Sequence, residues 1–142
     1  MDLRKLKKYM GSFRNNTNDC YLIENNYVIT DGYSVVCLKD NYDLNVIADY
    51  ENGIYRTMVN YLETFENLSS IGKLEDINYT EEDYKIDNDY GILIKNIKRI
   101  KNLIKANNIE LLINEGSYTK YIIKIENTKT KEVGYLLPTR KY

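Results

Sequence analysis

The chain has 142 residues, of which 43% are hydrophobic and 29% are charged, and its formal net charge is −1. These values are typical of one folded domain over residues 1–142, and they exclude wholesale disorder. No apolar run has the length of a membrane span, and no apolar stretch follows the basic N-terminus as in a secretory signal. We therefore expect a soluble, cytoplasmic protein without a membrane partner. The many Asn and Ile residues, the 15 Tyr and the single Pro indicate an AT-rich genome, such as that of a low-GC bacterium or its phage.

The chemistry of the chain is restricted by what it lacks. It contains no histidine, which removes the commonest acid–base catalyst and the commonest metal ligand. Its two cysteines, Cys20 and Cys37, make neither a disulfide framework nor a zinc site. We therefore expect no catalytic residues, no bound metal and no cofactor.

The first third of the chain predicts a helix followed by three strands. Leu3, Leu6, Met10 and Phe13 recur at helical spacing, which predicts a helix over residues 2–14. Two short apolar runs flank Glu24-Asn25-Asn26 and predict a hairpin, and Asp31-Gly32 predicts a second turn. The strands are expected at 21–23, 27–30 and 33–38.

The middle of the chain predicts two further helices separated by an acidic stretch. Residues 54–68 carry apolar side chains three and four apart, which predicts a helix. Residues 72–90 are strongly acidic without a clear period, which predicts a loop with at most one strand. Residues 92–106 show the clearest helical pattern of the chain, and Asn107-Asn108 ends it.

The last third predicts strands at 109–113, 118–125 and 133–137, with turns at 114–117 and 127–131. Helices and hairpins are mixed, and no β-α-β unit repeats. This pattern predicts an α+β fold with antiparallel sheet pairing.

The charges are segregated along the sequence despite the small net charge. Residues 1–14 hold five cations and one acid, and residues 91–105 hold five cations and no acid. Residues 40–90 hold 13 acids and three cations. An ordinary surface helix mixes both signs, because Glu–Lys pairs one turn apart stabilise it. Two helices almost free of acid therefore indicate a functional cationic surface, although a plainly solvated helix face is the alternative for either one alone.

A helical projection places the cations away from the predicted core. On the helix at 92–106 the buried stripe is predicted to be Leu93, Ile97, Ile100 and Ile104, with the cations opposite and Lys101 on the flank. The two cationic faces are expected to lie side by side and to bind DNA through Arg4, Lys5, Lys7, Lys8, Lys95, Lys98, Arg99, Lys101 and Lys105.

Such a surface contacts the phosphates of DNA and does not recognise individual bases. No aromatic residue is interleaved with the lysines, so base stacking on single strands is not indicated. We expect sequence-independent, salt-sensitive binding of duplex DNA, lost when Lys95, Lys98, Arg99 and Lys105 are changed to Glu.

Several segments together resemble one domain of a bacterial DNA polymerase sliding clamp. Val28-Ile29-Thr30-Asp31-Gly32-Tyr33 is similar to the hairpin turn of those domains, and Ile92–Lys105 is similar to their second helix. Gly134-Tyr135-Leu136-Leu137-Pro138-Thr139-Arg140 is similar to the C-terminal tail of the last clamp domain. The resemblance covers most of the chain. It departs from the family pattern at Tyr33 and Ser34, which follow Asp-Gly where clamps carry Arg or His.

The resemblance implies a single clamp-like domain with two basic helices packed on one face of the antiparallel sheet, and facing DNA. It also implies that replication proteins dock beside Leu136, Leu137 and Pro138, although burial of these residues in a final strand is the alternative. Clamps close into rings of six domains, so a ring would need six copies of this chain. The protein would then be a phage-encoded processivity factor or a mimic of the host clamp.

Two other functions remain open from the sequence. The acidic stretch with its many tyrosines is compatible with an inhibitor that acts as a decoy for a host DNA-binding or defence protein. The dense carboxylates of the chain are Glu81-Glu82-Asp83 and Asp87/Asp89, and this set is where an enzyme would hold Mg²⁺ or carry out hydrolysis. No phosphate-binding loop accompanies it, so we expect no enzyme.

Overall fold

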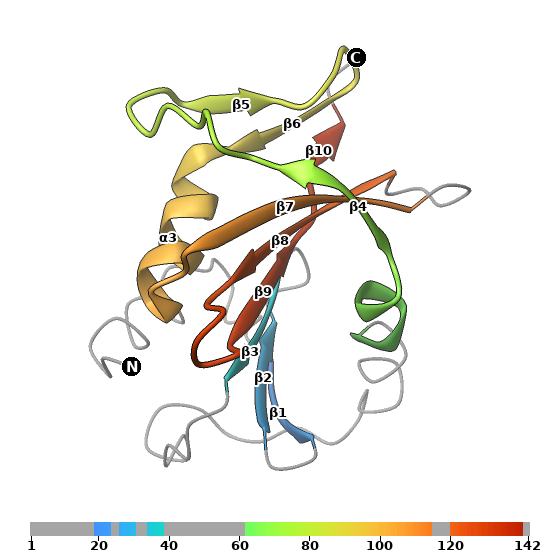
Figure 1. Ribbon diagram of the computed structural model, residues 1–142, viewed down its shortest axis with the longest axis vertical. Coiled ribbons are helices and arrows are strands. Elements are labelled where there is room, and N and C mark those ends of the chain that lie inside the picture. The colour runs from blue at the N-terminus through green and yellow to red at the C-terminus, as the bar shows by residue number, and fades with distance from the viewer. Residues whose placement is uncertain (1–18, 24–25, 31–33, 39–61, 115–119, 141–142) are drawn as a thin grey trace.

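The computed structural model describes residues 19–23, 26–30, 34–38, 62–114 and 120–140. Its strands form a seven-stranded sheet in the order β1-β2-β3-β9-β8-β7-β4 and a three-stranded sheet in the order β10-β6-β5 (Figure 1). All of these pairings are antiparallel. The strands are β1 (Asp19–Ile23), β2 (Asn26–Thr30), β3 (Ser34–Leu38), β4 (Ser69–Lys73), β5 (Asp83–Lys85), β6 (Tyr90–Leu93), β7 (Asn108–Ile113), β8 (Tyr121–Glu126), β9 (Val133–Leu136) and β10 (Thr139–Arg140). The α+β class with antiparallel pairing is therefore confirmed.

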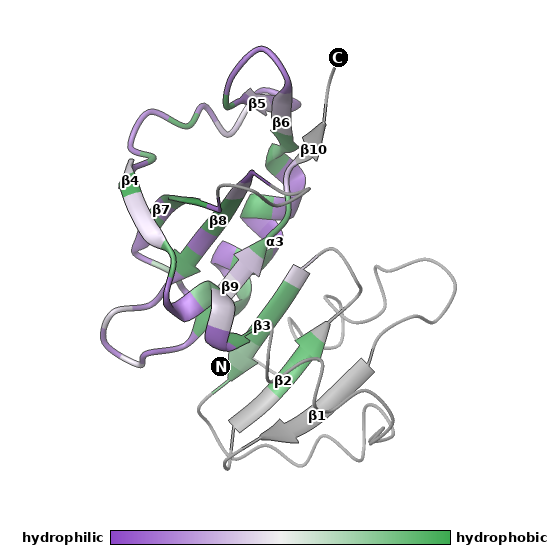
Figure 2. Ribbon diagram, turned by 90° about the vertical axis from the view of Figure 1, so that its right-hand side faces the viewer, coloured by the Kyte–Doolittle hydropathy of each residue, from purple (hydrophilic) through white to green (hydrophobic). Residues whose placement is uncertain are grey.

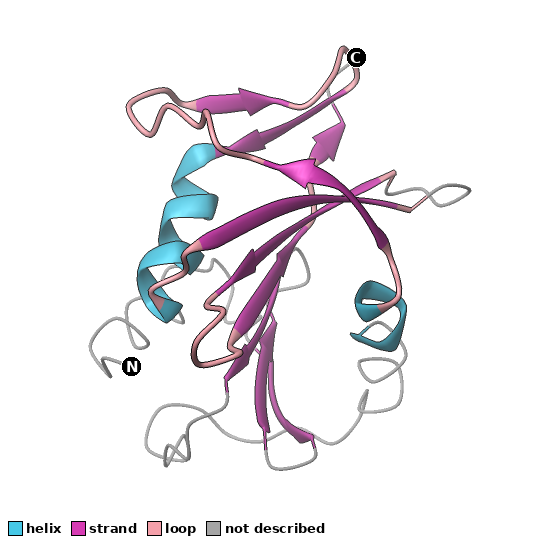
Figure 3. Ribbon diagram, viewed as in Figure 1, coloured by secondary structure: helices cyan, strands magenta, loops and turns pink. Residues whose placement is uncertain are grey.

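Two helical segments accompany the sheets (Figure 3). The longer is α3 (Ile94–Ile104), which follows β6 directly and leads into β7. The shorter spans residues 62–66 and precedes β4. The predicted helix at 2–14 and residues 54–61 of the predicted helix at 54–68 lie outside the described residues. Among the described helices, none has the length and apolar character that crossing a bilayer requires.

The large sheet consists of two three-stranded meanders joined at their last strands. β3 pairs with β9 in the middle, and β2 and β1 continue outward on one side as β8 and β7 do on the other. Because β3 and β9 are antiparallel, a rotation of about 180° around the axis perpendicular to the sheet approximately relates the two meanders. β4 then extends the second meander by one strand at the edge.

Each face of this sheet carries its own hydrophobic core. Successive side chains on a strand point to opposite faces, so Val36 and Leu38 of β3 face one core while Val35 and Cys37 face the other. The larger core lies between the sheet and α3, and Figure 2 shows that α3 bears both hydrophobic and hydrophilic residues. The smaller core includes Phe65 of the short helical segment, whose ring lies 5.1 Å from that of Tyr135.

Most sequence-predicted strands are confirmed within a few residues, and one prediction is wrong. Residues 72–90 contain the end of β4, all of β5 and the start of β6, rather than a loop with at most one strand. β4 is exposed throughout, β5 has three residues and β6 is buried or half-buried at all four positions, so none of them shows an alternation of buried and exposed side chains. They are formed by backbone pairing with β7 and with each other.

The predicted buried stripe of the helix is also shifted at its start. Leu93 still belongs to β6 and is half-buried, because the helix begins at Ile94 and not at Ile92 as predicted. Ile94 and Leu103 are buried instead, together with the predicted Ile97, Ile100 and Ile104. On the cationic side, Lys95, Lys98 and Lys105 are exposed as predicted, whereas Arg99, predicted to lie with them, is half-buried.

Candidate nucleic-acid interface

The candidate site is the outer face of α3, and its position is set by the apolar face beneath it. No side chain caps the N-terminus of the helix. Its stability therefore comes from packing, and the side chains of Ile97 and Ile100 are fully buried against the sheet. Gly134 of β9 allows this close contact, because a Cβ atom there would lie 2.5 Å from Cγ2 of Ile100. The orientation of α3 about its own axis is thus fixed.

Three lysines form an exposed stripe on the face opposite this packing. Lys95, Lys98 and Lys105 are all exposed, and Asn102 lies between them on the same side. Spacings of three and four residues align Lys95, Lys98 and Asn102 along one helix face, and Lys105 is the left-handed C-cap that follows the helix. At a rise of about 1.5 Å per residue, the stripe extends for about 15 Å along the helix axis. We call Lys95, Lys98 and Lys105 the lysine stripe.

The two other predicted cations of α3 are in different environments. Arg99 is half-buried and makes an interaction of its own. Lys101 is also half-buried, and its Nζ lies 4.4 Å from the ring centroid of Tyr79, within cation–π range. The exposed cations of this helix and its C-cap are therefore those of the lysine stripe. Arg99 and Lys101 instead interact with other groups of the protein.

The lysine stripe is not neutralised by carboxylates of the described residues. Within those ranges, no ion pair joins Lys95, Lys98 or Lys105 to an acid, whereas Lys124 and Glu126 of β8 lie 3.8 Å apart. The acidic stretch approaches α3 at its N-terminal end, where the Ile94 N–H donates a hydrogen bond to the carbonyl oxygen of Glu82. Tyr79 of the same stretch contacts Lys101 in the last turn of the helix, so this stretch reaches both ends of α3.

The cations predicted on the first helix, Arg4, Lys5, Lys7 and Lys8, lie outside the described residues. Whether two cationic helices merge into one surface stays a prediction.

The three residues predicted to border a partner pocket are partly or wholly buried. Leu136 belongs to the larger core and is 2% exposed, while Leu137 packs against the smaller core and Pro138 is half-buried. The C-terminal tail thus continues from β9 to β10, which pairs with β6. Docking of a partner peptide at this tail stays a prediction, and its accessible residues would be Leu137 and Pro138.

Asp87, one of the carboxylates considered for an enzyme, belongs instead to a polar cluster that joins the small sheet to the large one. Asp87 accepts hydrogen bonds from the backbone N–H groups of Asp89 and Tyr90 and from the hydroxyl of Tyr121, each at 2.8 Å. Lys120 Nζ lies 5.2 Å from the centroid of the Tyr121 ring. Asp87 and Tyr121 are 34 residues apart, so no local spacing pattern relates them.

The pKa shifts in this cluster agree with a structural role, in which it holds the β5–β6 turn against β8. Partial burial raises the pKa of Asp87, but its three hydrogen bonds and the nearby Lys120 charge outweigh burial, so the pKa lies below its ordinary value. The hydrogen bond and charge interaction with Tyr121 raise the pKa of Lys120, which burial opposes. Both groups thus keep their charges at neutral pH, and Asp87 acts as an acceptor that holds the β5–β6 turn against β8.

The carboxylates predicted as the densest acidic group differ in exposure. Glu81 and Glu82 are exposed before β5, and Asp83 is half-buried at its start. In the described part of the chain, no three His, Cys, Asp or Glu side chains gather in a group suited to a metal ion.

Comparisons of the chain with protein-family models, with curated proteins and with solved structures found no match.

Proposed function

We propose that this chain is a non-enzymatic, clamp-like protein that binds the phosphate backbone of duplex DNA through the outer face of α3. The observation that carries the proposal is the lysine stripe, which is exposed, not paired with described carboxylates, and mounted on a helix whose apolar face is fully buried. A row of ammonium groups on a well-packed helix matches a row of phosphates, because each ammonium group displaces condensed counterions without any base contact.

The arrangement of the described elements supports the clamp-like part of the proposal. A three-stranded meander (β1 to β3), the strands β4 to β6, the helix α3 and a second three-stranded meander (β7 to β9) follow one another along the chain. α3 covers one face of the joined sheet and leaves its cationic side outward. In this proposal the partners are duplex DNA and replication proteins, and the gene belongs to a phage.

The proposal is tested by titrating a short fluorescent DNA duplex with the protein at low salt and following its anisotropy. We expect binding that weakens steeply as salt is added and that differs little between unrelated duplex sequences. The variant Lys95→Glu/Lys98→Glu/Lys105→Glu should lose this binding, because it replaces three attractive charges by three repulsive ones. Arg99 is left unchanged because it is half-buried and engaged.

The matched control is Lys73→Glu/Lys85→Glu, which leaves the lysine stripe intact. It changes the net charge by the same amount as the paired stripe variant Lys98→Glu/Lys105→Glu, which should bind DNA much more weakly. The thermal unfolding of both paired variants should resemble that of the wild type. The proposal fails if the wild-type protein does not bind duplex DNA at low salt, or if the paired stripe variant and the control bind equally well.

An inhibitor with an acidic docking surface is the second candidate, and one observation favours it. Glu75, Asp76, Glu81 and Glu82 are exposed on a segment whose backbone is held in place, because Asn78 Oδ1 accepts hydrogen bonds from the N–H and hydroxyl groups of Thr80. A protein of this second kind would bind a basic protein partner and not DNA. The DNA titration above therefore separates the two candidates.

A further inference from the structure

The turn between β8 and β9 lies against the C-terminal end of α3 and brings two more lysines to that end. Asn127 Nδ2 donates hydrogen bonds to the carbonyl oxygens of Ile104, at 3.0 Å, and Lys105, at 3.1 Å. These carbonyls belong to the last turn of the helix and lack partners within it. The turn and the end of the lysine stripe are therefore joined directly through backbone atoms of Lys105.

The same asparagine also fixes the conformation of the turn. Its Oδ1 accepts hydrogen bonds from the N–H groups of Lys129, at 3.0 Å, and Thr130, at 3.1 Å. The Lys131 N–H donates to the carbonyl oxygen of Asn127 at 2.8 Å, and Lys131 has a left-handed φ of 68°.

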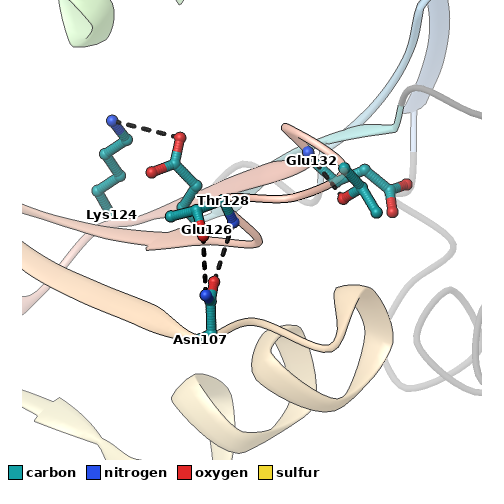
Figure 4. A network of polar contacts seen from close by, with 6 residues as sticks. Asn107, Lys124, Glu126, Thr128 and Glu132 are labelled. Carbon is teal, nitrogen blue, oxygen red and sulfur yellow. Dashed lines mark hydrogen bonds and ion pairs between the residues drawn. The ribbon is translucent and has the colours of Figure 1, made fainter.

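A second asparagine attaches the turn to the residues after the helix. Asn107 and Thr128 exchange two hydrogen bonds of 2.8 and 2.9 Å, which Figure 4 shows beside the end of α3. The backbone of the turn is thus held at both its start and its middle.

Among the described residues, the exposed charges at this corner all have one sign. Lys129 and Lys131 are exposed, as is Lys105 at the helix end. The acids that flank the turn are withdrawn, because Glu132 is 3% exposed and Glu126 is half-buried beside Lys124. The corner therefore presents three ammonium groups on a fixed backbone at the C-terminal end of α3.

We propose that Lys129 and Lys131 of the β8–β9 turn contact the phosphate backbone of duplex DNA together with Lys105, as a continuation of the lysine stripe. This inference rests on the proposed function and adds the residues that extend its footprint beyond the helix. Asn127 acts as the positioning residue, since it holds the turn and the helix end in one geometry.

The test measures the salt dependence of duplex binding for Lys129→Gln/Lys131→Gln and for the wild-type protein. Each phosphate contact contributes about 0.9 to the slope of log affinity against log salt. Loss of two contacts should make the slope shallower by about 2. Between about 50 and 200 mM salt, the wild type should therefore lose roughly tenfold more affinity than the variant. Glutamine keeps much of the side-chain length and removes the charge.

The matched control is Lys73→Gln/Lys85→Gln, which removes two exposed charges from β4 and β5 and should retain the wild-type slope. A turn variant with the wild-type slope, alongside a stripe variant that has lost binding, would overturn this inference and leave the proposed function standing. A turn variant and a control with equally reduced slopes would also overturn it, since only net charge would then matter. Failure of the wild type to bind would remove both.

Discussion

Asn127 is the single side chain that connects the most backbone groups at the end of α3. Its amide bonds two helix carbonyls on one side and two turn N–H groups on the other. A net contribution of about 0.5–1.5 kcal/mol per hydrogen bond, reduced by partial exposure, predicts that Asn127→Ala lowers the free energy of unfolding by about 2 kcal/mol. Chemical denaturation followed by circular dichroism measures this loss.

Two further variants give this prediction its controls. Asn88→Ala removes an exposed asparagine from the β5–β6 turn and should change stability by less than about 0.5 kcal/mol. Asn127→Asp keeps the acceptor for the turn but places carboxylate oxygens against the helix carbonyls, so its loss should be at least that of alanine at neutral pH. Equal stability of Asn127→Ala and wild type would show that the amide does not fasten the helix end.

Asp87 predicts a pH effect at the junction of the two sheets. Because its folded pKa lies below the ordinary value, its ionised form stabilises the fold above the ordinary pKa, and this contribution is lost as pH falls through the folded pKa. Tyr121→Phe removes one of the hydrogen bonds to the carboxylate. We expect the pKa of Asp87 to rise in that variant, as measured by an NMR titration of the side-chain carboxyl carbon. An unchanged pKa would show that the backbone bonds alone set it.

At the scale of elements, the contact between α3 and β9 depends on a missing side chain. Cγ2 of the fully buried Ile100 occupies the space that a Cβ at position 134 would fill. Gly134→Ala should therefore displace the helix or force a poor rotamer, at a cost of about 1–3 kcal/mol. Because the lysine stripe lies on the same helix, we expect weaker DNA binding as well as lower stability.

A double-mutant cycle isolates this contact. Ile100→Ala alone leaves a cavity and should cost about 2–5 kcal/mol, but it also removes the atom that a Cβ at position 134 would meet. The double variant should be less destabilised than the sum of the two single variants by about 1 kcal/mol or more, measured by denaturant unfolding. Additive losses would mean that the helix can shift away from β9 without strain.

The elements that the sequence predicted best are those rich in buried apolar residues, on one face of the helix and on both faces of the central strands. α3 carries buried isoleucines at helical spacing, and β3 and β8 carry buried residues such as Val36 and Ile123, so their patterns reflect the core directly. β4 is exposed at every position, and its Ser-Ser-Ile-Gly-Lys sequence gives no pattern. It becomes a strand because β7 offers an edge for pairing, which only the three-dimensional structure reveals.

The candidate site shows the same division. The lysines of α3 were predictable because a helix with a known apolar stripe has a known opposite face. Lys129 and Lys131 were not, because their place beside Lys105 depends on hydrogen bonds of Asn127 to residues more than 20 positions away. The one usable signal was the predicted turn at 127–131, which contains two lysines and no acid.

At the scale of the whole molecule, charge segregation explains how a chain of net charge −1 binds a polyanion in our proposal. Five cations without an acid occupy residues 91–105, while the acids are concentrated in residues 40–90. Binding to DNA depends more on the protein charge within one Debye length of the phosphates than on the net charge. That length is ~10 Å at about 0.1 M salt. The stripe on α3 and the turn beyond it provide that local charge.

The exposed edge of the large sheet affects whether copies of the chain associate by strand pairing. β4 is an exposed edge, and Ile71 on it is 53% exposed, which would favour pairing with a neighbouring strand. Its register, however, shifts between Ser70 and Gly72, and Gly72 has a φ of 141° that other residues rarely adopt. Such a bulge interrupts the row of backbone groups that a second strand would need.

We therefore expect light scattering to give the mass of one 16.8 kDa chain in the absence of DNA. With a short duplex, the mass of the complex should equal that of the duplex plus a small whole number of chains, because each chain contacts DNA from one side. A stable assembly of six copies without DNA would contradict this expectation and support a closed ring. In that case Ile71→Lys should break the assembly if β4 forms the contact, since a buried lysine would interrupt the new strand pair, while Lys73→Gln at the same edge should leave it intact.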